Sequence, residues 1–397
     1  MKIIVSASSI LRVFTAITLC LPLFLGADWP LYRGDPEATG RVPLSEPVMA
    51  APEVKEGLSR PNELRIVWQK TLEKGFFEAS PIVVGDTVYV GSADDYFYAF
   101  DLENGDERWK YPVEDGVLAT ASYWKGETGD GIVSFGDTAG VLHALDAKSG
   151  EKRWTFKTKG NIRTAPNVYK NRLLVGSEDN SLYCLDAADG KELWKYTTKD
   201  MIQSFATVAT DSADSGKTGK VRGFVAGCDG QLHVVDCESG RGIAQVELES
   251  PTGSTPAVLG DHVFLGTEGN EFLAIDWKKH VISWRFPSKQ AFRAPAAVMP
   301  GMVVCGGYDR KVYALDPASG KELWRFSSRK TIDGGPVVFG DRVFVVSNDA
   351  TVSLLDRRDG RKIASLELDG GIKASPAVVG NSLLVGTLEG VLYRIAF

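Results

Sequence analysis

Carboxylates recur along the chain at one point of a repeated pattern, and oxygen ligands gathered on one face of a protein can bind a cation. They are Asp94, Asp137, Asp179, Asp229, Glu268, Asp309, Asp349 and Glu389. Most of them precede glycine or a polar residue between two short apolar segments, which is the usual composition of a hairpin turn. We therefore interpret them as turn residues, with a cation site as the alternative.

Histidine offers no second site of this kind. The four histidines are His143, His233, His262 and His280. They fall at unrelated positions of the repeat, so neither a metal cluster nor a nucleophile and base pair can be composed from them.

Two polar segments have the residue types of ligand-binding loops. SGKTGK, from Ser215, resembles the end of a phosphate-binding loop, but Asp211 stands where that loop needs glycine and no helix follows. GETGDG, from Gly126, offers only Glu127 and Asp130 as charged oxygen donors, whereas Ca²⁺ takes about six to eight ligands. We interpret both segments as solvated hairpin tips and expect no bound calcium.

An internal repeat of roughly 40 residues organises the chain. Its marker is a string such as ALDPASGKELWRF, in which Asp316 is followed by Gly320 and Trp324. The aspartate recurs at Asp101, Asp146, Asp186, Asp236, Asp276, Asp316 and Asp356. A string repeated this often indicates an architecture and not a single active site.

Each repeat contains four short segments with alternating apolar and polar residues, which predicts antiparallel strands. In the first repeat they begin at Ser80, Thr87, Tyr96 and Glu107, with turn residues between them. Four strands in about 40 residues are typical of one blade of a β-propeller.

The two ends of the chain settle the number of blades. The last repeat stops at Phe397 without a fourth strand, and the missing strand is RIVWQKTL, from Arg65. An open ring of sheets would leave strand edges exposed. We therefore predict an all-β fold, an eight-bladed β-propeller of four-stranded antiparallel blades whose N-terminal strand completes the C-terminal blade.

A tryptophan on six of the eight outer strands should pack against the next blade and donate its indole N–H to the backbone there. These blade-docking residues are Trp68, Trp109, Trp154, Trp194, Trp284 and Trp324. Two blades have Ala244 and Ala364 at this position, and we expect weaker joints there because truncating a buried tryptophan costs about 3 to 5 kcal/mol.

Function is expected where the repeats differ, at the channel mouth, where one blade's outer strand leads to the next blade's inner strand. The eight residues there are Glu78, Leu118, Arg163, Gln203, Gly253, Arg293, Asp333 and Lys373. The candidate contacts for a polar ligand or a peptide segment are Glu78, Arg163, Gln203, Arg293, Asp333 and Lys373. Solvated loop residues without a particular role are the alternative.

The first residues resemble a secretory signal peptide. The apolar run from Val13 to Leu25 is too short to span a membrane, and small residues before Asp28 suit cleavage near Ala27. A lipoprotein anchor at Cys20 is the alternative, but Leu19 stands where lipoprotein signals have a small residue. We expect a secreted or periplasmic protein.

The sequence therefore divides into a signal peptide at 1–27, an N-terminal extension or linker at 28–64 and the propeller at 65–397. With 44% hydrophobic residues and a net charge of -6, the chain is globular. It has no dense basic run, so we expect no nucleic-acid partner. We also expect no transmembrane segment and a monomer.

Four cysteines remain after the signal peptide: Cys184, Cys228, Cys237 and Cys305. Cys184 and Cys305 stand where other repeats have small apolar residues, which indicates buried side chains. Cys228 and Cys237 flank one hairpin but are several residues out of register, too far apart to bridge. We predict no disulfide.

The repeated A-x-D-x-x-x-G-x-x-x-W string, the SP that opens a blade and the VYVGS of its second strand resemble the propeller repeat of pyrroloquinoline quinone (PQQ) proteins. The resemblance covers residues 65–397, and DWPLYRGD, from Asp28, is similar to the start of many secreted bacterial proteins of this class. The class contains quinone-dependent dehydrogenases and BamB-like scaffolds of outer-membrane protein assembly.

The resemblance implies a cofactor site only if certain residues are present. Dehydrogenases of this class have adjacent cysteines under the quinone, calcium ligands and a catalytic aspartate. No two cysteines are adjacent here, and the chain is shorter than such enzymes. We therefore predict a non-catalytic, BamB-like scaffold that binds a protein of the cell envelope or a polar ligand, with no PQQ. A divergent PQQ-dependent dehydrogenase or another propeller enzyme is the alternative.

Overall fold

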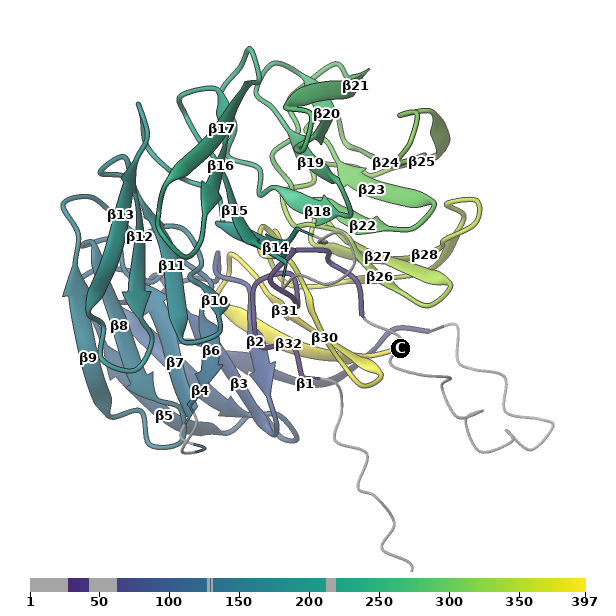
Figure 1. Ribbon diagram of the computed structural model, residues 1–397. Coiled ribbons are helices and arrows are strands. Elements are labelled where there is room, and N and C mark those ends of the chain that lie inside the picture. The colour runs from purple at the N-terminus through teal and green to yellow at the C-terminus, as the bar shows by residue number, and fades with distance from the viewer. Residues whose placement is uncertain (1–27, 43–62, 127–128, 130, 212–218) are drawn as a thin grey trace, which may run out of the picture.

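Short β-strands alternate with tight turns through the described part of the chain, and no helix is present there. The computed structural model describes residues 28–42, 63–126, 129, 131–211 and 219–397. Its strands form eight four-stranded sheets, which stand around a central axis as the blades of an all-β propeller (Figure 1). This is the fold class and blade number that the repeat predicts.

Each blade runs from an inner strand beside the axis to an outer strand at the rim. The strands of the first four blades are β2 (Ile82–Val84), β3 (Thr87–Gly91), β4 (Tyr96–Asp101) and β5 (Glu107–Pro112); β6 (Ser122–Lys125), β7 (Gly131–Gly136), β8 (Val141–Asp146) and β9 (Lys152–Lys157); β10 (Asn167–Tyr169), β11 (Arg172–Ser177), β12 (Ser181–Asp186) and β13 (Glu192–Thr197); β14 (Thr207–Thr210), β15 (Val221–Ala226), β16 (Gln231–Asp236) and β17 (Gly242–Glu247).

The second half of the chain repeats this order. The strands of the last four blades are β18 (Ala257–Leu259), β19 (His262–Gly266), β20 (Glu271–Asp276) and β21 (Val281–Pro287); β22 (Ala297–Met299), β23 (Met302–Gly306), β24 (Lys311–Leu315) and β25 (Glu322–Ser327); β26 (Val337–Phe339), β27 (Arg342–Val346), β28 (Thr351–Asp356) and β29 (Lys362–Glu367); β30 (Ala377–Val379), β31 (Ser382–Gly386), β32 (Val391–Ala396) and β1 (Arg65–Thr71).

The eighth blade takes its outer strand from the other end of the chain. β1 pairs antiparallel with β32, from Arg65 opposite Ala396 to Thr71 opposite Val391. Without β1, β32 would present an unpaired edge at the rim.

Outer-strand tryptophans join neighbouring blades. The indole Nε1–H of Trp68 donates to the carbonyl of Leu102 in the next blade at 2.9 Å. Equivalent bonds are made by Trp154, Trp194, Trp284 and Trp324. The ring of Trp284 lies over Gly320, where an added Cβ would be 2.7 Å from the indole. The tryptophan of the preceding blade thus packs on the glycine of the repeated string, where a side chain would clash with it.

Trp109 contacts the next blade without the indole hydrogen bond. The hydroxyl of Tyr89 donates at 2.9 Å to the Ala147 carbonyl, which holds the position that accepts an indole N–H in the other blades. Trp109 Nε1 is buried and has no hydrogen-bond partner among the described residues. The ring still covers Gly150, so packing remains where the hydrogen bond is absent.

The two blades without a tryptophan receive an aromatic side chain from the following blade. Trp277 lies in the same apolar cluster as Ala244 and packs edge-to-face on Phe224, with ring centroids 5.3 Å apart. Phe397 shares a cluster with Ala364 and lies 4.5 Å from the ring of Phe344. The missing ring is therefore supplied from the other side of the joint, and the weaker joints expected there stay a prediction.

Residues 28–42, named here the inner segment, lie inside the ring and are coloured purple in Figure 1. Trp29 pairs with Val83 of β2 through two main-chain hydrogen bonds of 2.9 Å. Further main-chain N–H groups of inner strands donate to carbonyls of the segment: Tyr123 to Pro30, Val208 to Pro36, Val258 to Glu37, Val298 to Thr39 and Val338 to Gly40. The segment thereby caps inner edges that a bare ring would leave unpaired.

Arg33 anchors the inner segment to the ring. It is only 1% exposed, and its guanidinium donates to the carbonyls of Gly335 at 2.9 Å and Ala296 at 3.3 Å and also to that of Pro336. Burial lowers the pKa of Arg33 to about 10, so the group remains protonated at neutral pH. A Cβ added at Gly40 would lie 1.9 Å from the Arg33 guanidinium.

A pair of glycine substitutions tests this anchor. Gly40 and Gly340 have φ of 60° and 59°, so alanine at either position costs about 1–2 kcal/mol of backbone strain. Nothing lies within 4 Å of a Cβ at position 340, whereas at position 40 the buried Arg33 must move and give up hydrogen bonds. We expect Gly40→Ala to cost about 1–3 kcal/mol more than Gly340→Ala in urea unfolding. Equal losses would contradict the anchor.

Replacing Trp277 tests the aromatic exchange between blades. Its side chain is 4% exposed, and we expect Trp277→Ala to lower the free energy of unfolding by about 3–5 kcal/mol. The control is Leu193→Ala, since Leu193 is 41% exposed and surface changes are usually within about 0.5 kcal/mol. Chemical unfolding followed by far-ultraviolet circular dichroism measures both variants. Similar stability of the two would show that Trp277 does not fill the joint.

Candidate functional site

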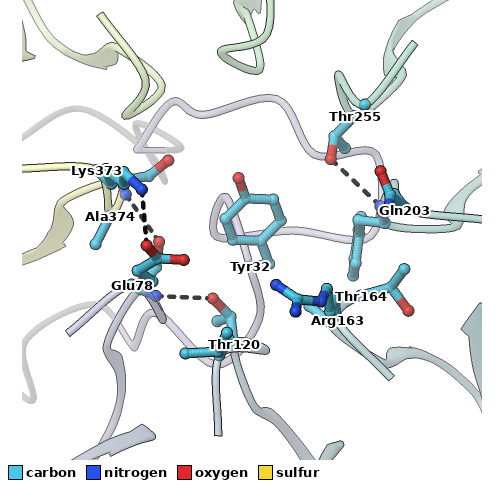
Figure 2. Close-up of a pocket in the computed structure, with 15 residues that line it drawn as sticks. Tyr32, Glu78, Thr120, Arg163, Thr164, Gln203, Thr255, Lys373 and Ala374 are labelled. Carbon is cyan, nitrogen blue, oxygen red and sulfur yellow. Dashed lines mark hydrogen bonds and ion pairs between the residues drawn. The ribbon is translucent and has the colours of Figure 1, made fainter. Parts of the chain in front are cut away.

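A pocket opens at the end of the axis where outer strands lead into the inner strands of the next blades (Figure 2). Its volume is about 160 Å³. The structure brings together four of the six candidate contacts there, namely Glu78, Arg163, Gln203 and Lys373. These residues are far apart in the sequence and meet only because the ring places equivalent loops around one axis.

Tyr32 stands in the middle of this pocket, with Glu78 and Lys373 on one side and Arg163 on the other (Figure 2). It belongs to the inner segment and packs edge-to-face on Phe205 with ring centroids 5.7 Å apart. Burial raises the pKa of Tyr32, so its hydroxyl stays protonated. The repeat could not indicate this residue because Tyr32 lies outside it.

The charged residues of the pocket differ in how firmly they are paired. Lys373 Nζ lies 2.8 Å from Glu78 Oε1. Arg163 Nε is 3.4 Å from Glu178 Oε1, an oxygen that also accepts a 2.9 Å hydrogen bond from Gln203. The Arg163 and Lys373 side chains are both 45% exposed, but Arg163 has the longer ion pair. It is the cation in the pocket that an incoming anionic group can reach with least disruption.

Hydroxyl groups link the blades around the pocket wall. Each accepts a hydrogen bond from a main-chain N–H of a neighbouring blade: Ser80 from Ser375, Thr120 from Ser80, and Ser375 from Gly335, all at 2.9 Å. A hydroxyl that accepts such a bond keeps its own proton to donate. The wall can therefore offer hydrogen-bond donors as well as charges.

Arg293 and Asp333 occupy the equivalent loops but are not among the residues that line the pocket. Arg293 makes a two-pronged ion pair with Glu268, at 2.7 and 2.9 Å, and stacks on Tyr308 with 4.7 Å to the ring centroid. Asp333 accepts hydrogen bonds from Tyr308 and Asn348. Burial, with Asp333 beside it, raises the pKa of Tyr308 to about 12. Both candidates are tied into one separate cluster.

Five of the recurring carboxylates bind side chains of their own blades. Asp94, Asp179 and Asp309 accept hydrogen bonds from tyrosine hydroxyls four residues later, at 2.7, 2.7 and 2.5 Å. The histidines of two other blades bind turn carboxylates, His143 to Asp137 at 2.8 Å and His233 to Asp229 at 2.9 Å. No group of three or more His, Cys, Asp or Glu side chains in the described residues could hold a metal ion. The arrangement is that of structural turns.

The four cysteines in the described part of the chain are free thiols, and three of them are buried. Burial raises the pKa of Cys184 to about 11 and also raises those of Cys237 and Cys305. These thiols are therefore poor nucleophiles. Cys228 is partly exposed near the pocket, with its sulfur 3.8 Å from Gln203 Oε1.

Some sequence predictions concern residues outside the described part of the chain. These are the signal peptide with Cys20, both acidic residues of the GETGDG loop, and most of SGKTGK. Within the described residues, no helix has the length and apolar composition needed to cross a membrane.

Comparison with known families gives two matches. The family model described as outer membrane protein assembly factor BamB matches residues 124–221, 217–308 and 308–396. The model described as glucose/ethanol/alcohol dehydrogenase, beta-propeller domain, matches residues 62–165. No curated protein gives a significant sequence match.

Solved structures with a similar fold come from both groups. BamB from Moraxella catarrhalis is 18% identical with a TM-score of 0.68, and the alignment covers 84% of this chain and 100% of that one. The quinohemoprotein alcohol dehydrogenase from Comamonas testosteroni is 15% identical with a TM-score of 0.72, covering 93% and 80%. A europium-containing methanol dehydrogenase is 15% identical with a TM-score of 0.69, covering 94% and 98%.

Identities this low establish the fold alone, and the fold is shared by binding proteins and enzymes. The family models, in contrast, match repeats along most of the chain. The eight-bladed ring, the repeated Asp, Gly and Trp positions and these matches agree. The chain belongs to the family of PQQ-like β-propeller repeat proteins that the BamB model describes.

Proposed function

We propose that this protein is a non-catalytic, extracytoplasmic scaffold that binds a partner protein of the cell envelope through the pocket at the channel mouth. One observation carries the proposal: the repeat position that varies from blade to blade places Glu78, Arg163, Gln203 and Lys373 around one pocket. Framework positions recur because every blade needs them. A converging set of residues that do not recur is what recognition of one ligand requires.

The dimensions of the pocket favour a protein segment as ligand. A volume of about 160 Å³ is below the roughly 300–1,000 Å³ of sites for drug-sized molecules. It suits one side chain or the end of a chain. An anionic group, such as an aspartate, a glutamate or a terminal carboxylate, would pair with Arg163 and meet hydroxyl donors on the wall.

The residues of the pocket do not fit a quinone cofactor. The described residues that line it include neither cysteine nor aspartate, whereas the resemblance to quinone-dependent dehydrogenases implies adjacent cysteines, calcium ligands and a catalytic aspartate. Cys184, Cys237 and Cys305 are buried and stand apart in the sequence. We therefore propose that the protein works without PQQ or calcium.

The proposed location rests on the sequence and the family, and a monomer is proposed beside it. A signal peptide at 1–27 is predicted, and the BamB model names an outer membrane assembly factor. We propose that the mature chain works as a monomer in the periplasm or outside the cell.

Crosslinked capture from the native cell envelope tests the binding site. We expect Arg163→Ala and Lys373→Ala each to reduce recovery of the partner about tenfold, since a hydrogen bond to a charged group contributes about 1.5–3 kcal/mol. The matched control is Arg293→Ala, which removes an arginine from the same repeat position outside the pocket, and it should leave recovery unchanged. Equal recovery with all three variants would exclude the channel mouth as the contact.

An activity assay tests the non-catalytic part of the proposal. We expect no reduction of a redox dye when the protein is given PQQ, calcium and alcohols or sugars. Turnover that depended on the added quinone would establish the dehydrogenase alternative.

A further inference from the structure

A second cavity lies at the rim of the propeller, between the sixth and seventh blades, away from the channel mouth. Its volume is about 350 Å³. Phe326 on β25 forms one side, and Ser353 on β28 and Ser365 on β29 form another. The packing at this joint differs from that of the joints that hold an aromatic pair.

At most other joints an aromatic pair fills the equivalent space. An outer-strand ring of one blade packs edge-to-face on a ring from the third strand of the next, as Phe156 does on Tyr183 at 5.3 Å and Phe286 on Tyr313 at 5.0 Å. Tyr111 and Tyr196 pack in the same way on His143 and His233, each at 5.6 Å. The third-strand ring is then hydrogen-bonded to the turn carboxylate of its own blade.

The joint between blades six and seven has the outer-strand ring, Phe326, and the turn carboxylate, Asp349, but it lacks the third-strand ring that would contact both. Ser353 stands at the position of Tyr183 and Tyr313, and no described ring packs on Phe326 in its place. Ser365, which pairs with Ser353 on the neighbouring strand, is also small. In the equivalent joints this position is Lys195 or Arg325, and each of these side chains lies over the tyrosine ring.

The carboxylate that would accept the missing hydroxyl is present. Asp349 holds the turn position of Asp179 and Asp309, and its side chain is 7% exposed. Its Oδ2 accepts a 3.1 Å hydrogen bond from the Arg329 main chain, as the Asp179 Oδ2 does from Lys159 at 3.0 Å. The Asp349 oxygen also receives the Arg329 guanidinium at 3.2 Å, and that side chain is 65% exposed. An exposed side chain of this kind can swing away when another donor arrives.

We propose that this cavity binds a phenol ring carrying a substituent opposite the hydroxyl, as in a tyrosine side chain. The ring would pack edge-to-face on Phe326 and donate its hydroxyl to Asp349, taking the place that tyrosine occupies in the equivalent joints. Such a group can come from a tyrosine of a partner protein or from a small phenolic molecule. This site is independent of the channel mouth and does not rest on the scaffold function proposed above.

Titration of the protein with p-cresol and with N-acetyl-tyrosinamide, followed by NMR chemical shifts, tests the site. Both probes should bind saturably, and toluene should bind about tenfold more weakly because it lacks the hydroxyl that bonds to the carboxylate. Binding of p-cresol alone would assign the site to small phenols, and binding of both would allow a tyrosine of a partner. Absence of saturable binding by either phenol, or binding of glucose in their place, would overturn the proposal.

Two substitutions of Ser353 distinguish loss of phenol binding caused by filling the cavity from loss caused by altered folding. Ser353→Tyr should restore the aromatic pair, raise the melting temperature and abolish phenol binding, whereas Ser353→Ala should leave binding unchanged. If Ser353→Tyr does not fold, Phe326→Ala replaces it and should weaken binding by about twofold to tenfold through loss of the ring contact. Phenol binding that persists unchanged in the folded Ser353→Tyr protein, or in Phe326→Ala, would refute the assignment.

Discussion

The unpaired inner edge of each blade is the constraint on which the structure depends. Backbone N–H groups buried without a partner destabilise a fold, and a propeller turns an inner strand edge from every blade toward its axis. Here the inner segment provides acceptors for Val83, Tyr123, Val208, Val258, Val298 and Val338. Fifteen residues that precede the repeats therefore supply main-chain acceptors to six of the eight inner strands.

The same segment shapes the candidate site. With Arg33 bound to the carbonyls of blades six and seven, the segment passes through the ring and places Tyr32 within the pocket. The mouth is consequently a small pocket with an aromatic residue at its centre. Side chains from the varied loop position then determine its charge.

The space between neighbouring blades is filled in different ways at different joints. The space between two blades must be filled, and Trp284 does so from one side by covering Gly320, whereas Trp277 and Phe397 fill the equivalent space from the other side. At the joint between Phe326 and Ser353 the aromatic ring of the third strand is missing, and a cavity remains. Departures from the repeat therefore have to be judged in three dimensions, because a neighbouring blade can compensate for one of them and leave another open.

The repeat predicted the blades, their number and the loops that surround the axis, because each depends on local turn and strand patterns. It could not separate Arg163, which lines the pocket, from Arg293, which does not line it and is bound to Glu268 and Tyr308. Neither the path of the inner segment nor the role of Tyr32 could be predicted, because a single extended stretch has no periodicity that reports its contacts. The role of Trp277 could not be predicted either, because it lies one residue after the repeated aspartate and not at the repeat position of the other tryptophans.

Hydrogen exchange of the inner-strand amides in the intact protein tests the central claim most directly. If the inner segment caps the ring, the amides of Val208, Val258, Val298 and Val338 exchange as slowly as amides within the blades, because each donates to a carbonyl of that segment. Exchange of these amides at the rate of exposed loops would show that the inner edges are open and would contradict the account.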